Sequence, residues 1–148
     1  MESLTQEQKN ELRKNIVFNA GKLEGILYEF GAEWKDYSET PKTLDCSELV
    51  EGVFHKAGLK ISDGSQNQFN ETIAVDNPKP GDLAFVGKGK NINKIYHVGI
   101  VFDENHIIEA RGFDPSASFE TGKVILRPIE RWKAWGNFVG FRSHSKLI

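Results

Sequence analysis

The hydrophobic pattern of this chain changes period once, and that change constrains the fold more than any other feature. In two segments, 5–30 and 46–58, the apolar residues recur at helical spacing, whereas from Leu83 onward they form short runs typical of strands. The segment between these parts, Pro78-Lys79-Pro80-Gly81-Asp82, predicts a turn. Helices followed by strands favour an α+β fold with N-terminal helices packed on a central antiparallel β-sheet. We expect residues 1–148 to form a single domain, because the sequence contains no linker.

The first helical pattern runs from about Thr5 to about Phe30. Ser3 or Thr5, each followed three residues later by a glutamine, resembles a capping box at the start of this helix. Gly21 and Gly25 each weaken the middle of the segment by about 1 kcal/mol relative to alanine. A break, or two shorter helices, therefore also fits the pattern.

The second helical stripe begins at Cys46, and Gly58 closes it. Residues 31–44, which precede it, show no periodicity and carry large side chains that include Trp34 and Tyr37. This stretch is typical of an ordered loop, which can form the wall of a cleft.

The second half of the chain predicts a loop and then a series of short strands. Residues 61–77 are polar and indicate a loop. The expected strands are residues 83–86, 95–102, 107–111, 124–126 and 138–141, with a hairpin turn at 103–106 and a short helical turn at 130–135.

Charge and composition exclude several classes of function. The net charge is −2 and both signs are interspersed, so we expect no nucleic-acid partner. No apolar run is long enough to span a membrane, and the segment 1–9 lacks the apolar core of a secretion signal. We therefore expect a protein that is synthesised in the cytoplasm and has no membrane partner.

The sequence has one cysteine, Cys46, and it opens the second helix within Asp45-Cys46-Ser47. Unpaired N–H groups and the helix dipole at this position stabilise a thiolate. A single cysteine excludes an internal disulfide, and no zinc-ligand spacing is present. The thiol is therefore either a packing residue of the core or a reactive group that takes part in chemistry.

A cysteine nucleophile requires a base, and His97 interrupts an otherwise apolar strand. If the strands pair across residues 103–105, facing residues have numbers that sum to about 206 to 208. His97 then lies opposite about residues 109 to 111, where Glu109 and Arg111 are the polar candidates. The hairpin alone can place a carboxylate beside the imidazole.

The chain resembles the NlpC/P60 family of cysteine peptidases in four motifs that occur in the family's order and approximate spacing. These are Leu44-Asp45-Cys46-Ser47, Pro80-Gly81-Asp82-Leu83-Ala84-Phe85, His97-Val98-Gly99-Ile100 and Ile108-Glu109-Ala110. The resemblance implies a papain-like core that hydrolyses peptide bonds of bacterial cell-wall stem peptides, commonly after D-γ-glutamyl. It also implies Cys46 as nucleophile, His97 as base and Glu109 as the third polar group, with the Pro80-Gly81-Asp82 turn supporting the site.

The chain departs from the family pattern at three places. Glu48 stands where glycine is usual, Glu109 stands where histidine is frequent, and residues 34–37 replace a Tyr-x-Trp-Gly-Gly-like stretch. Either Trp34 or Tyr37 is then the candidate for the family's tyrosine near the nucleophile. Further candidates for substrate binding or support are Asp45, Ser47 and Arg111.

Arg111 is either a solvent-facing residue of the hairpin or a residue that binds a substrate carboxylate. Trp132 and Trp135 are expected to be packing residues.

Together these features predict a cysteine endopeptidase of peptidoglycan stem peptides that needs no cofactor and no metal. Two alternatives remain open: a thiol amidase or acyltransferase that acts on another amide or ester, and a non-catalytic phage tail or assembly module of the same fold. The expected partners are a peptidoglycan peptide and, for some settings, a phage tail, a delivery apparatus or an immunity partner. We expect the protein to act on the cell wall after release or delivery.

Overall fold

The computed structural model describes residues 3–148. Residues 1–2, the start of the segment 1–9 considered above as a secretion signal, lie outside the described residues. The helices are α1 (Gln6–Gly21), α2 (Cys46–Lys56), α3 (Ser65–Glu71) and α4 (Ile129–Lys133). The strands are β1 (Leu27–Tyr28), β2 (Thr43–Leu44), β3 (Ile73–Val75), β4 (Leu83–Gly87), β5 (Ile95–Val101), β6 (His106–Arg111), β7 (Lys123–Pro128) and β8 (Phe138–Ser143). Two short 3-10 turns cover Lys88–Lys90 and Ser145–Leu147.

The strands form one sheet in the order β2-β1-β7-β6-β5-β4-β8-β3. Neighbouring strands are antiparallel except β1 and β2, which pair in parallel at one edge. In the β5-β6 hairpin Ile100 faces Ile108 and Val101 faces Ile107, which agrees with the register expected from the sequence. The α+β prediction is therefore confirmed, with a parallel edge pair that the sequence pattern did not indicate.

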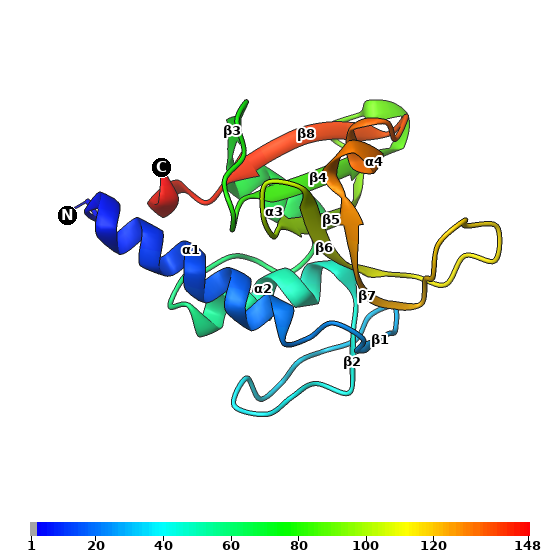
Figure 1. Cartoon of the computed structure of the whole chain (residues 1–148), viewed down its shortest axis with the longest axis horizontal. Coiled ribbons are helices and arrows are strands. Elements are labelled where there is room, and N and C mark those ends of the chain that lie inside the picture. Colours follow the sequence, from blue (N-terminus) through cyan, green and yellow to red (C-terminus); the bar gives the residue numbers. More distant parts are fainter. Residues whose placement is uncertain (1–2) are drawn as a thin grey trace.

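Two apolar layers hold the helices to the sheet. Figure 1 shows α1 and α2 on one side of the sheet and α4 on the other. The larger cluster lies between α1, α2 and the sheet and includes Leu49, Val53, Phe54, Val98 and Ile100. The smaller cluster lies under α4 and includes Ala84, Val86, Val101, Ile107, Ile129 and Trp132. Because both faces of the central strands are covered, these strands appear in the sequence as continuous apolar runs.

The first helix is shorter than the sequence pattern predicts. It begins with a capping box in which Thr5 and Gln8 exchange side-chain and backbone hydrogen bonds, and it ends at Gly21 instead of Phe30. The chain then turns through Gly25, whose φ of 92° is strained for residues with a Cβ. The next residues form β1, because pairing with β2 and β7 satisfies their backbone groups.

The prediction of a loop over residues 61–77 is wrong, because α3 and β3 lie there. The Gln68 side chain of α3 is fully buried and donates through Nε2 to the carbonyl oxygens of Ser47 and Ser62. The β3 strand pairs with β8, which lies at the other end of the sequence. Long-range contacts therefore order a polar segment that has little local signal of its own.

An ion pair joins α1 to the predicted turn before β4. Arg13 is 7% exposed and Asp82 is 2% exposed, and Arg13 Nη1 lies 2.8 Å from Asp82 Oδ1. The same guanidinium donates to the carbonyl oxygens of Pro80 and Leu147 at 3.0 and 3.1 Å. This contact ties the N-terminal helix, the turn and the C-terminal segment together. Within residues 3–148 no helix has both the length and the apolar character that crossing a bilayer requires.

Candidate active site

Cys46 is the first residue of α2, and Asp45 is the residue that caps this helix. Asp45 Oδ1 accepts from the backbone N–H of Glu48 at 2.9 Å, and its Oδ2 accepts from the N–H of Gly31 at 3.2 Å. Ser47 Oγ donates to the same carboxylate at 3.3 Å. In this structure Asp45 and Ser47 thus build the helix start that holds the thiol.

The Cys46 thiol faces the N-terminal part of β5. Its Sγ lies 4.0 Å from the carbonyl oxygen of Tyr96, and the side chain is largely covered. The next residue on β5, His97, interacts with the thiol through a hydrogen bond and through charge. The helix start and the strand therefore bring together the thiol of Cys46 and the imidazole of His97, which are far apart in the sequence.

His97 is paired with Glu109 on the neighbouring strand β6. His97 Nε2 lies 2.9 Å from Glu109 Oε1, and the side chains are 9% and 0% exposed. With Nε2 directed to the carboxylate, Nδ1 is the ring nitrogen left for the thiol. The structure thus brings Cys46, His97 and Glu109 into one contiguous group.

The electrostatics of this group favour a protonated imidazole. Burial of His97 disfavours the imidazolium, but hydrogen bonds and charges from Cys46 and Glu109 outweigh it and raise its pKa to about 9. Burial likewise disfavours the Glu109 carboxylate, yet His97, Arg127 and Arg111 together lower its pKa. A buried imidazolium–carboxylate ion pair results.

Glu109 has three further neighbours besides His97. Trp132 Nε1 donates to its Oε2 at 2.9 Å, while Arg111 and Arg127 approach its two oxygens at 3.5 and 3.6 Å. The Trp132 ring also stacks on the His97 ring, with centroids 5.4 Å apart and planes 18° from parallel. Trp132 thereby orients both the acid and the base.

The sequence pattern did not identify this role of Trp132, which is in the core as predicted but is also bonded to Glu109. A buried indole N–H usually has a hydrogen-bond acceptor. The need of a buried tryptophan for such an acceptor was the one signal in the sequence that could have pointed to this contact. Arg127 was missed as well, because a single arginine in a short strand has no distinguishing local pattern.

Trp34 and Tyr37 pack against α2 and against each other. Trp34 is 5% exposed and packs on Gly52 of α2, where a Cβ would stand 2.1 Å from its ring. Its backbone N–H donates to Glu48 Oε1 at 2.7 Å, so Glu48 anchors the loop to α2. Tyr37 packs on Trp34 and on His55, with ring centroids 5.3 and 4.3 Å away.

Tyr28 of β1 lies close enough to Cys46 and Asp45 for their charges to act on its hydroxyl. Burial raises the pKa of Tyr28, and the charges of Cys46 and Asp45 raise it further. The sequence pattern placed this residue inside the first helix, and the end of that helix at Gly21 corrects this. Trp34 and Tyr37, the two residues considered for a place near the nucleophile, pack on Gly52 and His55 of α2 and on each other.

Three carboxylates, two on α2 and one in the segment that follows it, are close enough to share a cation. Oxygen atoms of Glu48, Glu51 and Asp63 lie within 4.8 Å of one another. Burial raises the pKa of Glu51 to about 7, with contributions from Glu48 and Asp63, and a hydrogen bond joins the two glutamates. Burial and the crowding of the three carboxylates thus favour the protonated form of Glu51.

The group around His97 has the parts of an activated thiol. A carboxylate sets the orientation and tautomer of the imidazole, and the imidazole meets a thiol at a helix N-terminus. Such a group can attack a carbonyl carbon and protonate the leaving amine.

Comparison with known proteins points in the same direction. Residues 25–122 match the NlpC/P60 family. The probable endopeptidases p60 of Listeria monocytogenes and Listeria innocua are 35% and 33% identical to this chain over 98 residues, or 65% of it. These alignments cover only 18% and 19% of the two relatives, so the chain corresponds to about a fifth of their length.

Solved structures show the same fold. The P60 domain of an antigen from Mycobacterium avium subspecies paratuberculosis has a TM-score of 0.69 at 21% identity, covering 92% of this chain and 96% of that domain. The peptidoglycan hydrolase RipB from Mycobacterium tuberculosis has a TM-score of 0.69 at 23% identity, covering 95% of this chain and 67% of that one. At these identities the likeness establishes the architecture.

Proposed function

This chain belongs to the NlpC/P60 family, and we propose on that premise that it is a cysteine peptidase that hydrolyses peptide bonds in bacterial peptidoglycan. The single observation that carries the proposal is the contact of a helix-start thiol with a buried imidazole–carboxylate pair. The names of the relatives agree with it, since they include probable endopeptidases and a peptidoglycan hydrolase.

The proposed reaction begins with the Cys46 thiolate and the His97 imidazolium. The sulfur attacks the scissile carbonyl carbon, and His97 gives its proton to the leaving amine. Water, deprotonated by His97, then attacks the thioester, which releases the carboxylic acid product and restores the thiolate–imidazolium pair. Glu109 keeps the imidazole oriented and stabilises its positive charge throughout.

The N-terminus of α2 also supports the oxyanion that forms in this reaction. The backbone N–H of Cys46 is among the first N–H groups of the helix, which have no acceptor inside it. We therefore propose this N–H as one donor of the oxyanion hole. In its finer form the proposal is that the bond cut follows D-γ-glutamyl and that the protein meets the wall after release or delivery.

Replacing Cys46 by alanine is the direct test of the nucleophile. The Cys46→Ala protein should cleave purified wall peptides about ten-thousandfold more slowly or worse, because no other thiol is present. Circular dichroism and thermal unfolding should show an intact fold. Turnover at the original rate in a correctly folded Cys46→Ala protein would rule out this mechanism.

Two further measurements separate the alternative functions. Mass spectrometry of a panel of murein peptides should show cleavage at one defined bond, whereas turnover of unrelated amides or esters alone would indicate an amidase or acyltransferase. Iodoacetamide should modify Cys46 rapidly near neutral pH if the thiolate is present. Slow modification, as for an ordinary thiol, would favour a non-catalytic module.

A further inference from the structure

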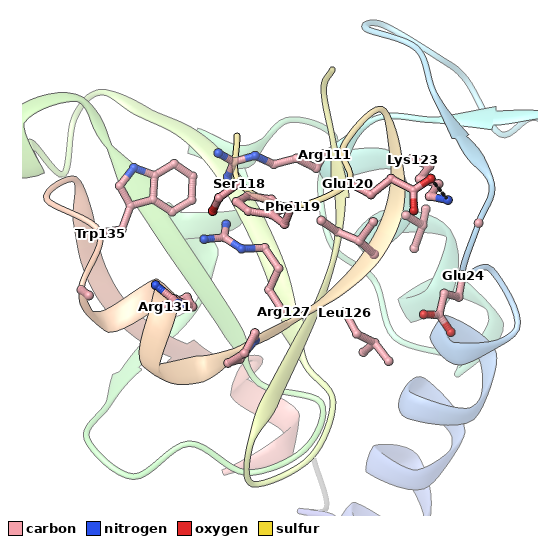
Figure 2. A pocket seen from close by; sticks show the side chains of 15 residues that line it. Glu24, Arg111, Ser118, Phe119, Glu120, Lys123, Leu126, Arg127, Arg131 and Trp135 are labelled. Carbon is pink, nitrogen blue, oxygen red and sulfur yellow. Dashed lines mark hydrogen bonds and ion pairs between the residues drawn. The ribbon is translucent and has the colours of Figure 1, made fainter. Parts of the chain in front are cut away.

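A pocket of about 930 Å³ lies beside β7, the strand that follows the β5-β6 hairpin. Figure 2 shows the guanidinium groups of Arg111 and Arg127 gathered between Phe119 and Trp135, with Arg131 below them. We call these five residues and the space they surround the arginine pocket.

Aromatic rings hold the two inner guanidinium groups in place. The Arg111 guanidinium carbon lies 4.4 Å from the centre of the Trp135 ring, and that of Arg127 lies 4.3 Å from the centre of the Phe119 ring. Cation–π contacts of this kind restrict the rotation of long side chains while leaving N–H donors at the edge of the guanidinium plane available. The donors are thus positioned before any ligand arrives.

Besides Glu109, the acids around the arginine pocket are Glu24 and Glu120, which line the end away from the guanidinium groups (Figure 2), and Asp114, which is close enough for charge interaction with Arg111. Glu120 is paired with Lys123 at 2.7 Å, at the opposite end of the pocket (Figure 2). Arg111 and Arg127 share a single carboxylate, Glu109, which already accepts hydrogen bonds of 2.9 Å from two other side chains.

Arg127 is the arginine of the pocket on which burial and like charges act together. Its side chain is 10% exposed, and its buried Nη1 lies 3.6 Å from Glu109 Oε2, just beyond hydrogen-bonding distance, and forms no hydrogen bond within residues 3–148. Burial lowers the pKa of Arg127, and the charges of Arg111 and Arg131 lower it further against the opposing effect of Glu109. An anion in the pocket would relieve this crowding of like charges.

Neutralising Glu109 does not account for the arginine pocket. Arg131 lines the pocket from α4, and no ion pair to Glu109 is formed by it within the described part of the chain. Even with His97 alone, the carboxylate has a counter-charge at hydrogen-bonding distance. The extra guanidinium groups instead form a positively charged recess.

The recess adjoins the proposed reaction centre. The Trp135 ring lies 5.8 Å from the His97 ring, and the same indole covers the Arg111 guanidinium. A substrate held at Cys46 can therefore extend past Trp135 into the arginine pocket. Guanidinium groups recognise carboxylates through paired hydrogen bonds, which suits a peptide with free acidic groups.

We propose that the arginine pocket binds a carboxylate of the peptide substrate that lies outside the bond being cleaved. This inference rests on the proposed peptidase function and adds substrate selection to it. A stem peptide with free carboxylates should then be a better substrate than the same peptide with those groups converted to carboxamides.

The test uses this matched pair of peptides and two variants on the same helix. Arg131→Gln removes an exposed pocket charge that makes no ion pair with Glu109, and Lys133→Gln removes an exposed charge of α4 that does not line the pocket. Wild type and Lys133→Gln should prefer the free-carboxylate peptide by about tenfold in kcat/KM. Arg131→Gln should lose most of this preference through a higher KM for that peptide.

Calorimetric titration of the Cys46→Ala protein with both peptides separates binding from catalysis. Tighter binding of the free-carboxylate peptide would support the pocket, provided that adding Arg131→Gln weakens that binding. This result would hold even if the wild type cleaved neither peptide, and the peptidase function alone would then be refuted. Equal cleavage and equal binding of the two peptides by the wild type would overturn the pocket and leave the peptidase function standing. Equal preference in Arg131→Gln and Lys133→Gln would also overturn it.

Discussion

Glu109 accepts hydrogen bonds from His97 and Trp132 through its two carboxylate oxygens, each at 2.9 Å. Because the carboxylate is fully buried, water cannot replace either partner. Its charge is one cause of the raised pKa of His97, about 9. The protonated imidazole therefore contributes stability fully below about pH 6.5, the unfolded value, and this contribution is lost as the pH rises through about 9.

Replacing Glu109 by glutamine should shift the pH dependence of activity. Loss of the negative charge lowers the pKa of His97, so the alkaline limb of kcat/KM should move to lower pH by about 1 to 3 units. Glutamine also presents an N–H₂ group to one of the two donors, so kcat/KM at its optimum should fall as well. The measurement is the pH profile of peptide hydrolysis for both proteins.

Arg142→Gln is a useful control because Arg142 bonds to Thr72, remote from the proposed site. Its pH profile should match that of the wild type. An unchanged alkaline limb in Glu109→Gln would remove Glu109 from the proposed triad.

At the scale of elements, Gly99 of β5 is what allows α4 to approach the sheet. A Cβ at this position would lie 2.6 Å from Ile107 and 2.9 Å from the Trp132 ring. Real Cβ atoms do not come so close in packed interiors, so the indole can stack on His97 only over a glycine. The packing of one helix thus depends on a missing side chain two residues from the base.

Gly99→Ala should therefore damage the site as well as the core. Overpacking costs about 1 to 3 kcal/mol, and the displaced Trp132 should lose its hydrogen bond to Glu109. We expect reduced kcat with a smaller change in KM, together with a change in tryptophan fluorescence or near-UV circular dichroism. Gly136→Ala, where a Cβ meets no atom within 4 Å, is the matched control. Equal stability and activity of the two variants would contradict this account of Gly99.

At the scale of the whole molecule, the proposed catalytic groups come from three elements that only the complete fold brings together. Cys46 lies on α2, while His97 and Glu109 lie on adjacent strands of the sheet. The buried Arg13–Asp82 ion pair ties α1 to the turn before β4, the strand next to β5. The position of the site thus depends on contacts that are remote from it.

Arg13→Ala should destabilise the protein by about 3 to 5 kcal/mol, because Asp82 then remains charged and buried without a partner. Adding Asp82→Asn should recover part of the loss, since an amide retains the acceptor for the N–H of Lys79. Lys14→Ala removes a neighbouring but exposed pair and should change stability by less than about 1 kcal/mol. Denaturant unfolding measures all three, and equal effects of Arg13→Ala and Lys14→Ala would refute the argument.

The sequence alone predicted the features that depend on neighbours along the chain. The helix that begins at Cys46 and the hairpin that brings Glu109 to His97 follow from local periodicity and a short loop, whose closure costs little entropy. Tertiary structure decided where the first helix ends, which Gly21 and Gly25 had left open, and it alone decided the order in residues 61–77. These segments gain their hydrogen bonds from strands and helices distant in sequence, which no local pattern records.

The same division applies to the proposed site. The thiol, the imidazole and the carboxylate are identifiable from residue type and spacing, because their chemistry requires those groups in that order. The positions of Tyr28 near Cys46, of Trp132 on Glu109 and of the guanidinium groups around Trp135 were decided by packing between separate elements. Side-chain contacts of this kind depend on how helices and strands pack against one another. No local sequence pattern specifies this packing, because it depends on contacts between segments that are distant in the sequence.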